Sequence, residues 1–155
     1  MISLKRRQAG FTIVELLIVI VVIGILAALV LNSFQGVQAR ARDTERRTDI
    51  NAVATQLEVY YNDKNGYPVG ADVASTTWQA ANLKGADAAA FVDPKGRAIN
   101  ATGSSYTYAN TGSTTGCVSP TDSSAADVTT GTFCEKFVLT ADLEKSADIT
   151  KNSLN

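Results

Sequence analysis

Glu15 is the residue whose type and position most clearly suggest a chemical role, because it stands directly before a long apolar run. From Leu16 to Leu31, every residue except Gly24 is Leu, Ile, Val or Ala. A carboxylate at the apolar side of a membrane helix costs about 2–3 kcal/mol or more, so such an acid usually has a partner or a task. Glu15 can lie in water at the membrane edge, or it can pair with an amine near the start of the helix.

Few other residues offer chemistry. The sequence contains no histidine, which removes imidazole as a base, as an activator of a nucleophile and as a zinc ligand. Cys117 and Cys134 follow a segment that would carry them out of the cytosol. Outside the cytosol, a disulfide is the expected state of two cysteines. We therefore predict no catalytic residues, no enzyme and no cofactor.

The small residues that suggest a cleavage site come before the apolar run. A secretory signal peptide has its small-residue site after the apolar core. Here Gln8, Ala9 and Gly10 precede the core, so a cut after Gly10 would keep the apolar helix on the protein. Cleavage after Ala28 is the competing interpretation, although the apolar stretch is long for a signal peptide.

Charge predicts how the apolar segment is oriented. Lys5, Arg6 and Arg7 precede it without any acid, which favours a single-pass helix with its N-terminus in the cytoplasm. The mixed charges of Arg40–Arg47 weaken this prediction, because they include further arginines on the other side. The chain contains 14 Lys and Arg and 15 Asp and Glu. Because Lys5, Arg6 and Arg7 lie in the leader, the part after the leader is acidic, and no nucleic-acid site is evident.

Residues 5–19, Lys-Arg-Arg-Gln-Ala-Gly-Phe-Thr-Ile-Val-Glu-Leu-Leu-Ile-Val, resemble the leader and helix start of type IV prepilins. The resemblance implies that a prepilin peptidase cuts between Gly10 and Phe11 and methylates the Phe11 amine. It also implies that Glu15 pairs with the terminal amine of an adjacent subunit and that Gly24 lies in the assembly helix. An ion pair that forms only in the correct register would favour docking in that register.

By the same resemblance, the protein is a subunit of a type IV pilus-like filament. It would be held in the cytoplasmic membrane by lipid contacts until an assembly platform and motor extract it into a helical homopolymer at the cell surface. Adhesion, twitching motility and DNA uptake are the expected roles. The alternatives are a pseudopilin of a type II secretion-like system and a single-pass anchored protein that never polymerises. Asp87 and Asp93 are an alternative metal site, similar to the calcium loop of major pseudopilins; otherwise no metal is expected.

The predicted fold class is α+β, a pilin fold in which a long N-terminal helix packs on a small C-terminal antiparallel sheet. Residues 1–10 form the leader, 11–33 the membrane-spanning and assembly half of the helix, and 34–155 the extracytoplasmic domain. Within that domain we assign 34–62 to the second half of the helix, 63–104 to a variable loop region, and 105–155 to the sheet with its disulfide loop.

The second half of the helix has an apolar period that requires a partner surface. Its stripe is predicted from Phe34, Val37, Ala41, Ile50, Val53, Ala54, Leu57, Tyr60 and Tyr61. Asn65 and Gly66, followed by Pro68, predict its end after about Tyr61. The charged segment Arg40–Arg47 is expected to be solvated, to contact other subunits, or to anchor the chain at the membrane interface.

Downstream, the patterns are weaker. We expect a short helix around Thr77–Leu83 and a turn at Asp93–Gly96. Strands are expected at Ser105–Tyr108 and Phe133–Leu143, with Phe133, Phe137 and Leu139 in the core, and with Asp142 and Glu144 as solvated acids.

Overall fold

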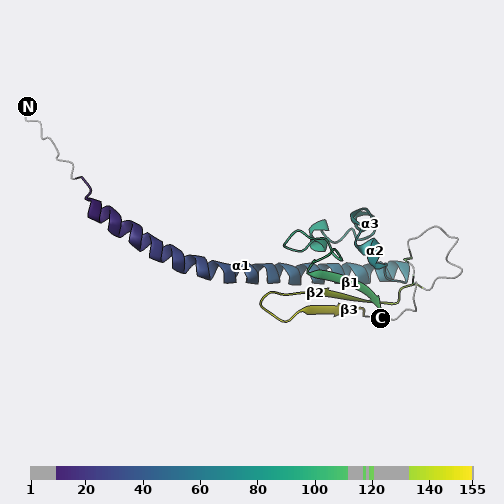
Figure 1. Cartoon of the computed structure of the whole chain (residues 1–155). Coiled ribbons are helices and arrows are strands. Elements are labelled where there is room, and N and C mark those ends of the chain that lie inside the picture. The colour runs from purple at the N-terminus through teal and green to yellow at the C-terminus, as the bar shows by residue number, and fades with distance from the viewer. Residues whose placement is uncertain (1–9, 112–116, 118, 121–132, 155) are drawn as a thin grey trace, which may run out of the picture. The chain divides into compact units, whose positions relative to one another are not determined.

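The structure is a computed structural model, and it describes residues 10–111, 117, 119–120 and 133–154. It has the predicted α+β architecture, shown in Figure 1, with a long N-terminal helix and a three-stranded antiparallel sheet of order β1-β2-β3. The elements are α1 (Ile13–Lys64), α2 (Gly70–Val73), α3 (Thr76–Asn82), the 3₁₀ helix η1 (Ala88–Phe91), β1 (Tyr106–Thr111), β2 (Lys136–Ala141) and β3 (Ile149–Asn152). The chain forms two units, Met1–Gln38 and Ala39–Asn155, and each is described by itself.

In the second unit, α1 buries one face against the sheet. Ile50, Val53, Leu57 and Tyr60 follow one another at helical spacing and are at most 4% exposed. They share a core with the inward residues of the sheet, which are Tyr106, Tyr108, Phe137, Leu139 and Ala141. In β1 and β2 these residues alternate with less buried ones, as a sheet with one covered face requires.

The early part of the predicted stripe is wrong. Phe34 and Val37 are 57% and 64% exposed, and Ala41 is exposed as well. Ala39, Asp43 and Arg46 take the inward positions instead, because they lie in phase with Ile50 on the helix. The apolar period continues through the sequence, but within the second unit the core that α1 shares with the sheet begins at Ile50.

The C-terminal end of α1 is set by local backbone chemistry. Asn65 adopts a left-handed conformation with φ of 57°, and its N–H donates to the Tyr61 carbonyl at 2.7 Å. Tyr67 then forms an isolated antiparallel bridge with Cys134. A Cβ on the buried Gly66 would lie 2.8 Å from Phe133 Cβ, so only glycine fits this crossing.

The strand prediction for Phe133–Leu143 holds only for its middle. β2 begins at Lys136, so Phe133 lies before it and is half-buried, whereas Phe137 and Leu139 are in the core as predicted. Asp142 and Glu144 lie after the strand, in the connection to β3. β3 is a four-residue strand inside the region 105–155 that the sequence assigns to the sheet.

Between α1 and β1 the chain follows the predicted short helix and turn, with two additions. α3 covers the expected helix and is capped by the Ser75 hydroxyl, which accepts from the Trp78 N–H. At the turn, the N–H of Gly96 donates to the Asp93 carbonyl at 2.8 Å, and Gly96 has a φ of 80°. α2 and η1 are a single turn each, too short to show a helical period in the sequence.

In the first unit, the described part of α1 covers residues 13–38. This helix is long and apolar enough to cross a membrane, and none of its most apolar window is buried. Its large apolar side chains, from Ile13 to Leu31, are 48% to 84% exposed. Within the first unit, no described residue covers this apolar face.

Candidate assembly site

Glu15 lies at the N-terminus of α1, where it forms a reciprocal cap with Thr12. The Thr12 N–H and hydroxyl both donate to Glu15 Oε2, at 3.0 and 2.9 Å, and the Glu15 N–H donates to Thr12 Oγ1 at 3.2 Å. This is a capping box, in which a Thr and a Glu three residues later satisfy each other's backbone donors. The carboxylate is thus held at the positive end of the helix dipole.

The geometry leaves room for a second partner at this carboxylate. Both bonds from Thr12 use Oε2, and among the described residues Oε1 has no hydrogen-bond partner. Gly10 and Phe11 precede the cap and are exposed, with Phe11 at 88%. A cation arriving from another molecule can therefore approach Oε1 without breaking the cap.

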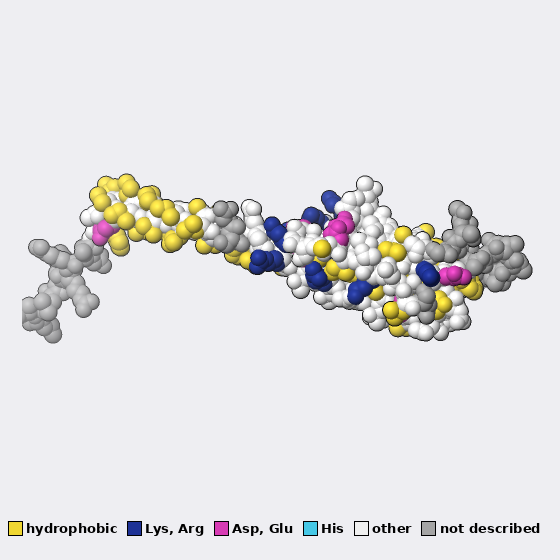
Figure 2. All heavy atoms as spheres, turned by 90° about the horizontal axis from the view of Figure 1, so that it is seen from below, with side chains coloured by type: hydrophobic (Ala, Val, Ile, Leu, Met, Phe, Trp, Pro, Cys, Tyr) yellow, Lys and Arg dark blue, Asp and Glu magenta, His cyan; other side chains and the backbone are white. Residues whose placement is uncertain are grey.

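The rest of the first unit presents apolar surface. Figure 2 shows hydrophobic side chains gathered over the first part of α1, beyond a single acidic group at its start. A Cβ on Gly24 would meet nothing within 4 Å, so inside this chain the glycine is not required by packing. A small residue on an otherwise apolar helix face lets the backbone of another helix approach closely.

At the start of the second unit, a charge cluster ties α1 to the β2–β3 connection. Asp43 accepts the backbone N–H groups of Glu144 and Lys145, each at 2.8 Å, and Arg46 Nη1 at 3.0 Å. Glu144 accepts Arg46 Nη2 at 2.9 Å and both Arg42 Nε and Nη2, at 2.9 and 2.6 Å. Arg46 is fully buried, and these contacts replace the water lost at Nη1 and Nη2, whereas its Nε has no hydrogen-bond partner among the described residues.

Electrostatics in this cluster favour the charged carboxylates. Burial alone raises the pKa of Asp43, but the N–H groups of Glu144 and Lys145 and the Arg46 guanidinium outweigh it, and the pKa is lowered. The hydrogen bonds from Arg42 and then Arg46 hold the pKa of Glu144 far below its usual range. The predicted solvated or subunit-facing character of Arg40–Arg47 is therefore wrong for Asp43 and Arg46, and Glu144 is not a free solvated acid.

Sequence reasoning missed Thr12 as the intrachain partner of Glu15, and Glu144 as the partner of Arg42 and Arg46. Thr12-Ile13-Val14-Glu15 is a capping-box pattern, so its signal was present in the sequence. Glu144 lies 102 residues from Arg42, and no local pattern connects them.

The two cysteines and the alternative metal residues have structural positions. Cys117 and Cys134 form a disulfide, which joins the segment before β2 to the disulfide loop; that loop lies mostly outside the described residues, as do the leader residues 1–9. Asp93 accepts backbone N–H groups of Lys95, Arg97 and Ser105, so its carboxylate holds the turn. Asp87 caps η1. Among the described residues no three His, Cys, Asp or Glu side chains gather, so the calcium interpretation gains no support.

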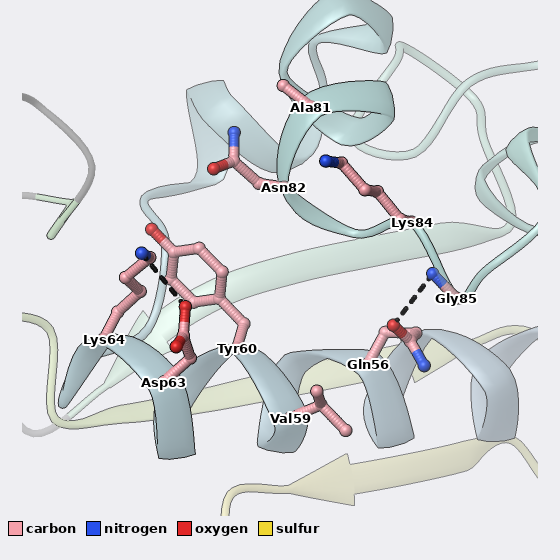
Figure 3. Close-up of a pocket in the computed structure, with 9 residues that line it drawn as sticks. All are labelled: Gln56, Val59, Tyr60, Asp63, Lys64, Ala81, Asn82, Lys84 and Gly85. Atoms are coloured by element: carbon pink, nitrogen blue, oxygen red, sulfur yellow. Dashed lines mark hydrogen bonds and ion pairs between the residues drawn. The ribbon is translucent and has the colours of Figure 1, made fainter.

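A polar hollow of about 540 Å³ lies between the last turns of α1 and the segment after α3 (Figure 3). Within it, Asp63 and Lys64 pair at 3.0 Å, and Gln56 accepts the Gly85 N–H at 3.1 Å. The Gln56–Gly85 hydrogen bond holds α1 to the segment after α3, whereas the Asp63–Lys64 pair lies within α1. Among the described lining residues, no pair of groups is arranged for acid–base or nucleophilic chemistry.

Comparisons with known proteins bear on the N-terminal part. Residues 5–31 match a family model described as the prokaryotic N-terminal methylation motif. The chain is 44% identical over 64 residues to the type II secretion system core protein G of Aeromonas hydrophila, covering 41% of this chain and 45% of that protein. It is 39% identical over 61 residues to the type IV major pilin PilA of Myxococcus xanthus, covering 39% of this chain and 28% of that protein. It is 40% identical over 76 residues to the fimbrial protein EcpC of Eikenella corrodens, covering 47% of this chain and 50% of that protein.

The chain thus spans about half or less of the length of these curated relatives, and no solved structure matches it. The matched motif and these relatives confirm the predicted resemblance to the class of type IV pilins and pseudopilins over the N-terminal part of the chain, and the α+β fold is consistent with it. Within that class, this chain is similar both to secretion-system proteins and to pilus or fimbrial proteins.

Proposed function

We propose that this protein is the precursor of a pilin-like filament subunit. The single observation that carries the proposal is an exposed apolar helix that begins with a carboxylate whose Oε1 is free of partners among the described residues. In a bilayer, lipid covers this helix, and in a filament the same helices of other copies cover it. The same apolar surface of the helix can therefore be covered by lipid before assembly and by other copies after assembly, as a subunit that is stored in the membrane and then assembled requires.

Processing would convert the stored form into the assembling form. Cleavage between Gly10 and Phe11 by a prepilin peptidase removes the leader and creates an α-amine at Phe11, which the same enzyme methylates. The exposure of both residues supports access to this bond. The intact mass and N-terminal sequence of protein from native membranes test this step: an N-methylated Phe11 start supports it, and a start at Met1 or after Ala28 contradicts it.

Glu15 would then select the register of docking. The Phe11 amine of an adjacent copy can reach Oε1 while Oε2 continues to accept from Thr12. In an apolar surrounding an unpaired carboxylate is costly, so subunits docked in the wrong register lose this ion pair. The pairing acts only between copies, which ties filament growth to alignment.

Two substitutions at Glu15 separate its assembly role from its capping role. Glu15→Gln keeps an oxygen that accepts from Thr12 but removes the charge, whereas Glu15→Ala removes both. We expect at least a tenfold drop in the fraction of protein recovered in filaments for both variants, with unchanged membrane insertion. Thr12→Val, which loses the hydroxyl but keeps Glu15, is the control and should assemble within about threefold of wild type. Normal assembly of Glu15→Gln would refute the ion pair.

A pseudopilin of a type II secretion-like system is the second candidate, supported by the similarity to core protein G of several bacteria. Its filament would stay short and within the envelope, whereas a pilus extends from the cell surface to serve adhesion, twitching motility or DNA uptake. Both candidates need an assembly platform and motor. Electron microscopy of cells producing the chain at its native level separates them by filament length and location.

A further inference from the structure

The exposed side of α1 at the start of the second unit carries opposite charges on two flanks. Arg40 and Arg47 are seven residues apart, about two turns, so they share a face, which we call the basic flank. Glu45 and Asp49 are four residues apart and share another face, the acidic flank. Buried Arg46 lies between the two flanks around the helix, so they point to opposite sides of the face that packs on the sheet.

The charged groups of these flanks form no ion pairs with other described residues. Arg40, Glu45 and Arg47 are exposed, and none forms an ion pair with another described residue. Their neighbours on the helix behave differently, because Arg42 and Arg46 are both bound to Glu144. One stretch of helix thus has internally paired charges facing the sheet and unpaired charges on both flanks.

The acidic flank also extends beyond the helix. Asp49 Oδ2 accepts the Tyr106 hydroxyl at 2.6 Å, which places this carboxylate beside β1. Burial, and then the nearby carboxylates of Glu45 and Asp87, raise the pKa of Asp49 although Tyr106 donates to it. The carboxylates of Glu45 and Asp87 thus disfavour the charged form of Asp49, and a cation from a second molecule would favour it.

We propose that the basic flank of one copy packs against the acidic flank of a second copy. The inference rests on the proposed filament function and adds a contact between the second units. A contact between two different surfaces of the same chain does not close on itself, and its repetition generates a helical fibre. Opposite charges across such a contact favour the correct partner and register over like-charged arrangements.

The spacing of the charges defines a register. If two parallel copies of α1 are displaced by five residues, about 7.5 Å, Arg40 of one lies level with Glu45 of the other. In the same register Arg47 lies three residues, about 4.5 Å, from the level of Asp49, within the length of an arginine side chain. One displacement therefore serves both pairs.

Charge reversal tests the pairing in the full chain, expressed with its native assembly machinery. Arg40→Glu and Glu45→Arg each place like charges across the contact, and we expect at least a fivefold drop in the fraction of protein in filaments. The double variant restores opposite charges between copies and should recover to within twofold of wild type. Since Arg40 and Glu45 lie about 140° apart on their own helix, this recovery cannot come from a pair within one chain. Lys136→Glu, an exposed reversal on β2, is the matched control and should leave assembly unchanged.

Cysteine cross-linking gives a second readout. Arg40→Cys with Glu45→Cys should form intermolecular disulfides on mild oxidation in cells, whereas Arg40→Cys with the exposed Thr55→Cys should not, because Thr55 lies ten residues further along. If the wild type forms filaments and both single reversals assemble normally, the flank pairing is overturned while the proposed filament function stands. Failure of the double variant to recover would point to a lipid or another protein as the partner of Arg40 and would overturn it too. Absence of any multimer of the wild-type chain would instead overturn the filament function, and the flank pairing with it.

Discussion

Replacing Asp43 by alanine is expected to destabilise the second unit strongly. Asp43 is 4% exposed and accepts three hydrogen bonds, from the N–H groups of Glu144 and Lys145 and from Arg46. Its removal leaves two backbone donors without their acceptor and a buried guanidinium with less compensation. Breaking a buried ion pair on one side costs about 3–5 kcal/mol. Because Glu144 still accepts from Arg46, we expect a loss near the lower limit, about 3 kcal/mol in the free energy of unfolding.

The measurement is urea unfolding of the full chain in detergent micelles, with the disulfide intact. Trp78 is the only tryptophan, and its ring lies 5.3 Å from that of Tyr60, so its fluorescence reports on the packing of the second unit. Asp63→Ala is the matched control: Asp63 is exposed, and its one ion pair among the described residues is with the exposed Lys64, so its loss should cost at most about 0.5 kcal/mol. A loss below about 1 kcal/mol for Asp43→Ala would refute the view that this carboxylate holds the β2–β3 connection to α1.

The pH dependence gives a further check on the same residue. The pKa of Asp43 in the folded chain lies below its ordinary value of 3.8, so its carboxylate stabilises the fold fully above that value. The contribution is lost as the pH falls through the lowered pKa. The stability difference between wild type and Asp43→Asn should therefore be constant near neutral pH and shrink below about pH 4. A difference that persists unchanged to pH 2 would contradict this assignment.

Three other predictions concern the second unit. Gly66→Ala should cost about 1–3 kcal/mol in the same urea assay, because its Cβ would overlap Phe133; an unchanged midpoint would show that the crossing relaxes freely. Reduction of Cys117–Cys134, which are 17 residues apart, should lower the free energy of unfolding by about 3 kcal/mol, as compared in urea with and without reductant; equal midpoints would contradict this. Tyr106→Phe should cost about 1–2 kcal/mol in the same assay by removing the hydrogen bond to Asp49. Burial and this bond raise the pKa of Tyr106, so wild type and Tyr106→Phe should show the same phenolate absorbance as the pH rises through the ordinary tyrosine range while both stay folded; additional phenolate in wild type would contradict this.

Much of the fold could be predicted because its signals are local. The apolar period of Ile50, Val53 and Leu57 predicts a helix with one buried face, and Asn65 and Gly66 predict its end. The turn at Asp93–Gly96 and the helix α3 follow from residues adjacent in sequence. Predictions failed where a tertiary contact decides the outcome. Phe34 has the right spacing but is 57% exposed, and Phe133 lies one residue before a bridge and not within the strand.

The sequence by itself determined the resemblance of the N-terminal part, which rests on the residues around Gly10 and Phe11, on Glu15 and on the apolar run that follows it. These features depend on the order of neighbouring residues, because a helix and its cap form from contacts three or four positions apart. Only the tertiary structure decided that Arg46 is buried and Arg47 is exposed, since the two are alike in sequence. Arg46 turns inward because Glu144, 98 residues away, and Asp43 together compensate its charge, and a contact over that separation exists only once the chain has folded.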